Sequence, residues 1–222
     1  IFTGILVAKS SVLKKYIPEI DNNNSAKEFY LTDLIGIAHK NGFKINTLSS
    51  SNEETAGANN RAEQEELEKT LRKMKSEDLL RNGATLLDKS RVDVRGEVKT
   101  GSDCVIDVNV IFEGYVELGN NVEIGANTII CDTKIGDGTK ILPFSHIDAS
   151  EIGAGCSIGP HARLREGSII MDGARIGNFV ETKKTILGRD SKANHFTYLG
   201  DAEVGDEVNI GAGTITCNYD GV

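Results

Sequence analysis

The sequence predicts three parts in series: an α/β segment, a long polar helix and a parallel β-helix. The β-helix rests on one observation, a small aliphatic residue that recurs every six residues, occasionally five, from Leu118 to Ile210. A period of six suits neither a helix nor a long half-buried strand. It suits a solenoid in which three short strands form a coil of about eighteen residues that rises roughly 4.8 Å.

The repeat also explains why glycine is abundant, at 24 of 222 residues against a usual ~7%. We expect each aliphatic side chain to point into a narrow core and stack on its counterpart in the next coil. The glycine that often follows permits a sharp bend. The handedness of the coil does not follow from the spacing. The pairs are Leu118-Gly119, Ile124-Gly125, Ile135-Gly136, Ile152-Gly153, Ile158-Gly159, Ile176-Gly177, Val204-Gly205 and Ile210-Gly211.

Composition narrows the possible functions. The net charge of −8 argues against a general nucleic-acid binder, but a local cationic pocket could still hold a small phosphate-bearing substrate. No apolar run is long enough to span a membrane, and no signal peptide opens the sequence. The four cysteines form no C-x-x-C pair, which favours buried thiols in a reducing compartment over zinc ligands. We expect a soluble, cytoplasmic protein.

Residues 1–61 show no repeat. Ile1–Ala8 and Phe43–Leu48 have the composition of strands, whereas Ser10–Ile17 and Phe29–Lys40 have that of helices. This alternation is typical of an α/β sheet. Sixty residues bury too little surface to be stable alone, so we expect the end of a larger domain. Because the sequence lacks an initial methionine and stops directly after a strong repeat, we expect a fragment of a longer protein.

Residues 61–81 form the clearest predicted helix, with Asn60 as its cap and Asn82-Gly83 as its stop. Leu67, Leu71 and Met74 give it one apolar stripe among dense mixed charge, as in a helix that bridges two domains. The expected boundaries are therefore 1–61 for the α/β segment, 62–82 for the linker helix and 83–222 for the β-helix. Residues 83–117 should form its first coils.

A candidate site surrounds residues 185–203, where the repeat is predicted to break and form a loop that carries His195. Arg165 and Lys183 are eighteen positions apart, so they should stack on consecutive coils as a phosphate clamp. A histidine beside such a clamp could deprotonate an amine before acylation. The plainer readings, an exposed loop histidine and solvated surface charges, stay open. Asn59 could likewise be only a helix cap.

Several stretches resemble the GlmU family of bacterial N-acetylglucosamine-1-phosphate uridyltransferase/glucosamine-1-phosphate N-acetyltransferases. The resemblance covers nearly the whole chain in collinear order. The acetyltransferase half is matched by R-L-R at 163–165, G-N-F-V-E-T-K-K at 177–184, A-N-H-F-T-Y-L-G-D-A at 193–202 and N-I-G-A-G-T-I-T-C-N-Y-D-G at 209–221. The end of the uridyltransferase half is matched by T-G-I-L-V-A at 3–8, N-N-N at 22–24, E-F-Y-L-T-D at 28–33 and G-A-N-N-R at 57–61.

The resemblance implies a Rossmann-like uridyltransferase segment, a left-handed β-helix and a homotrimer with active sites between neighbouring β-helices. It implies acetyl transfer from acetyl-coenzyme A to glucosamine-1-phosphate, then uridylyl transfer from UTP to give UDP-N-acetylglucosamine for peptidoglycan and lipopolysaccharide. His195 would be the general base, and Asn59 would bind Mg²⁺ and the UDP-sugar. The other implied contacts are Arg165, Lys183, Tyr198 and Asn209 for the sugar phosphate, and Ala212, Asn218 and Tyr219 for acetyl-coenzyme A.

Two positions depart from the family. Phe2 stands where an asparagine usually contacts the nucleotide sugar, and Glu166 replaces a common proline after Arg165. The glycine-rich nucleotide loop is absent, and so are coils beyond Val222, so we expect no uridyltransferase activity and little acetylation from this chain alone. The alternatives are a sugar-nucleotide pyrophosphorylase with a purely structural or regulatory β-helix, and a non-enzymatic solenoid.

Overall fold

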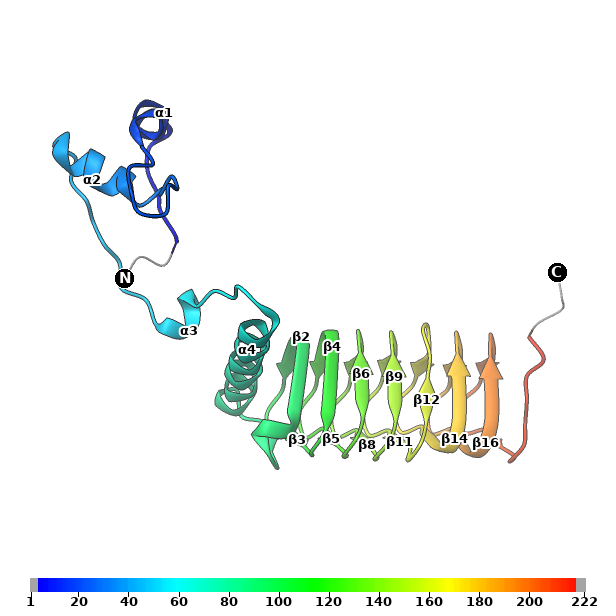
Figure 1. Ribbon diagram of the computed structural model, residues 1–222. Helices are drawn as coiled ribbons and strands as arrows, with labels where there is room; N and C mark the ends of the chain where they lie inside the picture. The colour runs from blue at the N-terminus through cyan, green and yellow to red at the C-terminus, as the bar shows by residue number, and fades with distance from the viewer. Residues whose placement is uncertain (1–3, 219–222) are drawn as a thin grey trace. The chain divides into compact units, whose positions relative to one another are not determined.

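The computed structural model describes residues 4–218 of the chain, except for the side chain of Asn52. The chain forms two compact units, residues 1–67 and 68–222, which are described separately (Figure 1). Within the described residues, no helix has both the length and the apolar character needed to cross a membrane.

The first unit is helical. Its helices are α1 (Ser10–Tyr16), the short 3-10 helix η1 (Ile17–Glu19), α2 (Asp33–Lys40) and α3 (Asn52–Thr55). The Tyr16 ring is buried and lies edge-on to Phe43, with 5.8 Å between ring centroids. Both predicted helices are confirmed, although α2 begins at Asp33 and not at Phe29. It ends before Gly42, whose φ of +80° suits the left-handed residue after a helix.

The predicted strands of this unit are wrong for the residues that the structure describes. Neither Gly4–Ala8 nor Phe43–Leu48 is a strand, and residues 1–3 of the first predicted strand lie outside the described range. Val7 is 95% exposed and Leu48 fully exposed. A strand needs the backbone of a neighbour to pair with, and this part of the unit offers none. The α/β assignment of residues 1–61 is therefore not realised here.

Helix α4 (Arg61–Arg81) is confirmed at both ends. The Asn60 side-chain oxygen accepts from the backbone N–H of Glu63 at 3.0 Å, which satisfies one of the free donors of the first turn. At the other end Gly83 has a φ of +92°, and the N–H of Ala84 donates to the carbonyl of Leu79 at 3.1 Å.

The predicted apolar stripe of α4 is not the face that packs. Leu71 and Met74 are 51% and 41% exposed, whereas Ser76 and Leu79 are buried. Lys75 donates to the carbonyl of Gly96 in the first coil at 2.7 Å. Charged side chains thus help to fix the C-terminal part of α4 against the solenoid, which the count of apolar residues could not show.

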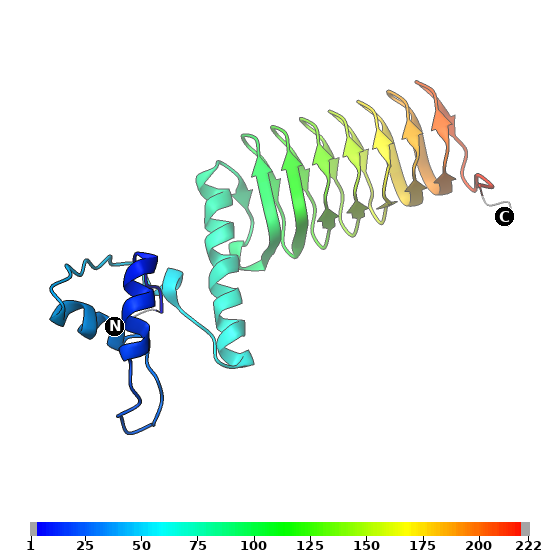
Figure 2. The same cartoon turned by 90° about the horizontal axis from the view of Figure 1, so that it is seen from above.

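The second unit is a parallel solenoid with three faces, and its coils follow one another along a single axis (Figure 2). Face A carries β7 (Lys134–Ile135), β10 (Glu151–Ile152), β13 (Ile169–Ile170), β15 (Ile186–Leu187) and β17 (Glu203–Val204). Face B carries β1 (Thr85–Leu86), β3 (Val105–Ile106), β5 (Glu123–Ile124), β8 (Lys140–Ile141), β11 (Ser157–Ile158) and β18 (Asn209–Ile210). Face C carries β6 (Ile129–Cys131), β9 (His146–Asp148) and β12 (Arg163–Leu164).

Four longer strands run around corners between faces. Strands β2 (Val92–Thr100) and β4 (Val110–Leu118) pass from face C to face A, and the 3-10 helix η2 (Lys89–Arg91) precedes them. Strands β14 (Arg175–Lys183) and β16 (Lys192–Gly200) pass from face B to face C. The predicted solenoid is therefore confirmed, and it is consistent with the left-handed β-helix that the resemblance implies.

The core is a stack of aliphatic side chains, one per face in each coil. On face B, for example, the fully or almost fully buried column comprises Ile106, Ile124, Ile141, Ile158, Ile176 and Ala193. Cys104 and Cys156 are also buried, as predicted, and burial raises the pKa of both thiols. The same prediction is wrong for Cys217, which is exposed, and Cys131 is only partly buried. Such a core leaves every coil supported by the coils on either side.

The predicted loop at residues 185–203 is wrong. This segment forms β15, β16 and β17 without interruption, and β16 pairs with β14 from Arg175↔Lys192 to Lys183↔Gly200. The inward aliphatic positions of this coil are occupied by Leu187, Ala193 and Leu199, of which Ala193 lies in register with Ile176 of the coil before. Buried hydroxyls occupy the neighbouring core positions, as they do in other coils. The Ser191 hydroxyl donates to the carbonyl of Gly205 at 2.7 Å, and that of Thr185 to the carbonyl of Leu199 at 2.8 Å. Because these buried hydroxyls have backbone partners, their burial does not interrupt the coil.

Candidate functional site

Arg165 and Lys183 lie on consecutive coils of face C, as their spacing predicts. Strands β12 and β14 pair with Arg163 opposite Glu181, and the N–H of Arg165 donates to the carbonyl of Thr182 at 2.8 Å. Lys183 therefore follows Arg165 in the same outward column. Two cationic side chains one coil apart form a surface that suits a phosphate.

Glu181 pairs with the first of these cations and was not predicted as a site residue. Its carboxylate accepts from the Arg165 guanidinium at 3.0 Å, and both side chains are 40% exposed. Lys183 has no carboxylate within 4.0 Å among the described residues. The two cations thus differ, because one has an internal counter-ion and the other does not.

Tyr198 and Asn218 gather around Gly200 on the next coil. Tyr198 is in register with Glu181, and Gly200 with Lys183. The Tyr198 hydroxyl and the Asn218 side-chain nitrogen lie where a side chain on Gly200 would begin. Asn218 also donates to that hydroxyl at 3.4 Å and to the Asp201 carboxylate. Gly200 is a second residue that the sequence reasoning missed, and only its absent Cβ makes room for this arrangement.

His195, Asn209 and Ala212 lie on face B. Asn209 begins β18 and pairs with Lys192, whereas His195 is in register with Asn178. Ala212 precedes Gly213, whose N–H donates to the carbonyl of Phe196 at 2.9 Å, so Ala212 lies one coil from His195. Three of the predicted site residues therefore form one group on face B, separate from the group on face C.

One chain does not bring the two groups together. Phe179 in β14 and Phe196 in β16 have φ values of 56° and 44°, and at each of them the strand turns from face B to face C. His195 precedes this corner and the residues opposite Lys183 follow it. The predicted convergence of Arg165, Lys183 and His195 on one crevice is therefore not achieved within a single chain.

A histidine outside the predicted site has a more constrained environment. His146 lies beside Arg163 on face C, with 2.5 Å between its Nδ1 and the guanidinium. Partial burial lowers the pKa of His146, and the positive charge of Arg163 lowers it further. The nitrogen of a neutral ring can accept a hydrogen bond from the guanidinium, which stays charged, so Arg163 extends the cationic surface of face C beside Arg165.

Asn59 makes hydrogen bonds to the first turn of α4. Its backbone N–H and its side-chain amide both donate to the Glu63 carboxylate, at 2.7 and 3.2 Å, and the backbone hydrogen bond is the main cause of the lowered Glu63 pKa. Mg²⁺ prefers about six oxygen ligands, and no group of three or more His, Cys, Asp or Glu among the described residues could hold a metal. These residues alone do not fit a Mg²⁺ site. Phe2 and Tyr219 lie outside the described residues.

Comparisons with known proteins agree with the repeat. The family model for bacterial transferase hexapeptide (six repeats) matches residues 132–166. A solved structure described as Francisella novicida UDP-N-acetylglucosamine acyltransferase covers 52% of this chain and 60% of its own, at 14% identity. Its TM-score of 0.29 is too low to support any argument.

The most informative relative is the bifunctional protein GlmU of Aromatoleum aromaticum (strain DSM 19018 / LMG 30748 / EbN1). It is 48% identical over 220 residues, which is 99% of this chain and 48% of the relative. The chain thus spans about half the length of the curated relative that it matches. Along almost its whole length, the chain is similar to one half of a GlmU protein and carries its hexapeptide transferase repeats.

Proposed function

We propose that this chain carries the acetyltransferase β-helix, preceded by the end of the uridyltransferase domain, of a bifunctional enzyme that makes UDP-N-acetylglucosamine. The acetyl group would pass from acetyl-coenzyme A to glucosamine-1-phosphate. The observation that carries the proposal is the pair Arg165 and Lys183 on consecutive coils, with the Tyr198 hydroxyl above them over Gly200. The identity to a GlmU protein over the whole chain supports it.

In the proposed reaction, Arg165 and Lys183 hold the sugar phosphate, and Tyr198 and Asn209 orient the sugar. His195 accepts a proton from the substrate ammonium group, because only the free amine is nucleophilic. The amine nitrogen then attacks the thioester carbonyl and a C–N bond forms, the nitrogen gives up a second proton, and the C–S bond breaks. The coenzyme A thiolate leaves and takes up that second proton, while His195 returns its own proton to solvent. Holding amine and thioester in attack geometry is the main contribution of a site of this kind.

The remaining parts of the proposal follow the relative. Ala212, Asn218 and Tyr219 would contact acetyl-coenzyme A. The second reaction would join the acetylated sugar phosphate to UTP, with Asn59 near the UDP-sugar and Mg²⁺ as the cofactor. The described residues do not form a Mg²⁺ site, so no step of the mechanism is assigned to that ion. The protein would act in the cytoplasm as a homotrimer and supply a precursor of peptidoglycan and lipopolysaccharide.

Binding of glucosamine-1-phosphate tests the proposal without relying on turnover. In isothermal titration calorimetry, Arg165→Ala combined with Lys183→Ala should abolish binding, because the phosphate loses both cations. Arg175→Ala is the matched control, since Arg175 is an exposed cation on face B, and it should bind like the wild type. Equal binding by the double variant and the control would contradict the proposal.

The role of His195 is tested in the full-length protein. His195→Ala should remove acetyl transfer and leave uridylyl transfer unchanged, because the imidazole acts only on the amine. A pyrophosphorylase with a purely structural β-helix predicts no change in either reaction. Loss of both reactions would point to a folding defect, which circular dichroism would detect.

A further inference from the structure

Two outward columns of side chains cross the three coils of face C that hold the candidate phosphate clamp. The strands β9, β12 and β14 pair in register, so each column has one residue per coil, about 4.8 Å from the next. Listed from the earliest coil to the latest, the first column contains His146, Arg163 and Glu181. The second column, two residues further along each strand, contains Asp148, Arg165 and Lys183.

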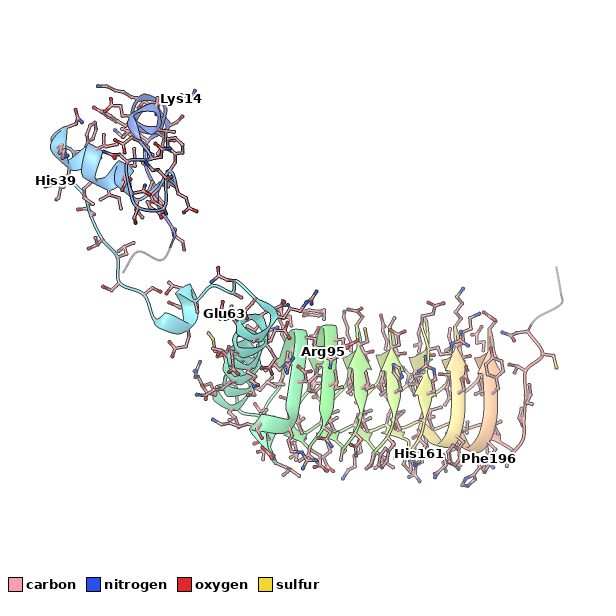
Figure 3. The ribbon with its side chains drawn as sticks, in the orientation of Figure 1. Lys14, His39, Glu63, Arg95, His161 and Phe196 are labelled. Carbon is pink, nitrogen blue, oxygen red and sulfur yellow. The ribbon has the colours of Figure 1, made fainter. Side chains whose placement is uncertain are left out.

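Arg163 does not use the carboxylate that its register offers. Arg163 and Glu181 carry opposite charges one coil apart, and the same arrangement forms an ion pair near the start of face C. There the guanidinium of Arg95, which is labelled in Figure 3, donates to the Glu113 carboxylate at 2.8 Å. Among the described residues, Arg163 has no carboxylate within 4.0 Å. Its guanidinium instead lies 2.5 Å from Nδ1 of His146, on the coil before.

Arg165 also bonds outside its own column. Asp148 lies one coil before it in register, yet the Arg165 guanidinium donates across the columns to Glu181 at 3.0 Å. Within the part of the chain that the structure describes, no cation lies within 4.0 Å of the Asp148 carboxylate. Glu181 and Lys183 belong to the same strand, β14. The contact with Glu181 therefore directs Arg165 toward the coil of Lys183, where the second cation of the clamp lies.

A second arrangement of these side chains would follow the register. Arg163 would pair with Glu181, and Arg165 would turn back to Asp148. This arrangement has two ion pairs among the four residues, whereas the observed one has a single ion pair. It would also point Arg165 away from Lys183 and open the clamp. Some other contact must therefore favour the observed arrangement.

The hydrogen bond between Arg163 and His146 is that contact. Partial burial lowers the pKa of His146 and the charge of Arg163 lowers it further, although Asp148 and Glu113 act in the opposite direction. The neutral ring therefore predominates at pH 7, and its Nδ1 can accept a hydrogen bond from the guanidinium. While Arg163 is held on the earlier coil, Glu181 has no competitor for Arg165.

We propose that His146 is a positioning residue for the phosphate clamp of Arg165 and Lys183. By holding Arg163 on the earlier coil, it leaves Glu181 to direct the Arg165 guanidinium toward the later one. The proposal rests on the proposed function, in which the two cations of the clamp bind the sugar phosphate. His146 acts through its neighbours and does not touch the substrate. Its loss should lower the fraction of molecules whose clamp is ready to bind.

Crystal structures of the full-length protein without ligand test the exchange of partners. In His146→Ala, Arg163 should pair with Glu181, and Arg165 should turn to Asp148. His146→Asn is the matched control, because its side-chain oxygen is a neutral acceptor close to the position of Nδ1. This control should keep the wild-type contacts. An alanine variant in which Glu181 still holds Arg165 would overturn the proposal.

Isothermal titration calorimetry with glucosamine-1-phosphate tests the effect on the clamp. His146→Ala should weaken binding about fivefold, as expected when about one fifth of the molecules keep the competent arrangement, and His146→Asn should bind like the wild type. Adding Asp148→Asn to His146→Ala should restore binding, because Arg165 loses its alternative partner. In an Arg163→Ala background, His146→Ala should have no further effect, because no guanidinium then competes for Glu181.

The two experiments separate the proposal from the function on which it rests. An equal loss of binding with and without Arg163 would mean that His146 acts by another route, and the proposal would be wrong. If the ligand-free structures show the exchange but the wild type does not bind glucosamine-1-phosphate, the proposed function is contradicted and the exchange of partners stands.

Discussion

The two units of this chain differ in how well the local sequence pattern predicts their structure. In the solenoid, the partner of each residue lies one coil away, at a nearly constant separation in sequence, and its core residues are almost entirely buried. In the first unit, Val7 and Leu48 belong to segments with the composition of strands, but both side chains are exposed. The contrast shows that each coil of a repeat supplies the strands with which the next coil pairs. A short segment with the composition of a strand forms one only where partner strands are present.

Introducing an aspartate into each unit should give the largest difference in stability between the two units. Ile158→Asp places a carboxylate in a fully buried position of face B and should lower the free energy of unfolding by more than about 4 kcal/mol. Val7→Asp, at an exposed position, should change it by less than about 0.5 kcal/mol. Urea unfolding followed by circular dichroism measures both. Similar losses for the two variants would mean that the exposed residues of the first unit are buried in solution.

The effect of a glycine-to-alanine substitution on the free energy of unfolding should have opposite signs in the two units. A Cβ on Gly177 would collide with the backbone carbonyl of Asn194 in the next coil, so Gly177→Ala should destabilise the solenoid by roughly 1–3 kcal/mol. Gly36 lies within α2 and has open space around it. Gly36→Ala should stabilise that helix by roughly 0.5–1 kcal/mol. Thermal unfolding separates the two, and a stabilised Gly177→Ala variant would refute the close approach of the coils.

A third glycine has a smaller, local effect that stability cannot reveal. Gly200→Ala should fold normally, because its Cβ meets only the ends of the Tyr198 and Asn218 side chains. Displacing the Tyr198 hydroxyl should weaken glucosamine-1-phosphate binding about tenfold, the loss of roughly one hydrogen bond to a charged group. Gly57→Ala, in open space in the first unit, should bind normally. Unchanged binding by Gly200→Ala would remove Tyr198 from the proposed site.

The predictable parts of the fold are those with short-range causes. The ends of α4 follow from Asn60 and Gly83, and the stacking of Arg165 on Lys183 follows from their spacing of one coil. The predicted loop around His195 is wrong because Ala193, whose side chain is too small to mark the aliphatic repeat, occupies the core position that Ile176 holds in the coil before.

The candidate site was less predictable than the fold, for a geometric reason. Spacing along the chain gives the height of a residue on the solenoid, but the face depends on where each corner falls. The position of His195 before the corner at Phe196 could not be derived from its distance to Lys183. Glu181 could have been identified from the sequence, since it lies within the same motif as Lys183. Nothing in the sequence indicates a role for Gly200, because that role depends on the Tyr198 and Asn218 side chains that lie close to it.

The ion pair between Arg165 and Glu181 has a consequence for how an anion would arrive. A phosphate that docks on Arg165 must displace a carboxylate that already neutralises it, so binding would be an exchange of one anion for another. Of these two cations, only Lys183 would then supply uncompensated attraction. Affinity should therefore fall less steeply with added salt than two unpaired cations would require. The released Glu181 carboxylate would stand next to the bound sugar as a ready hydrogen-bond acceptor.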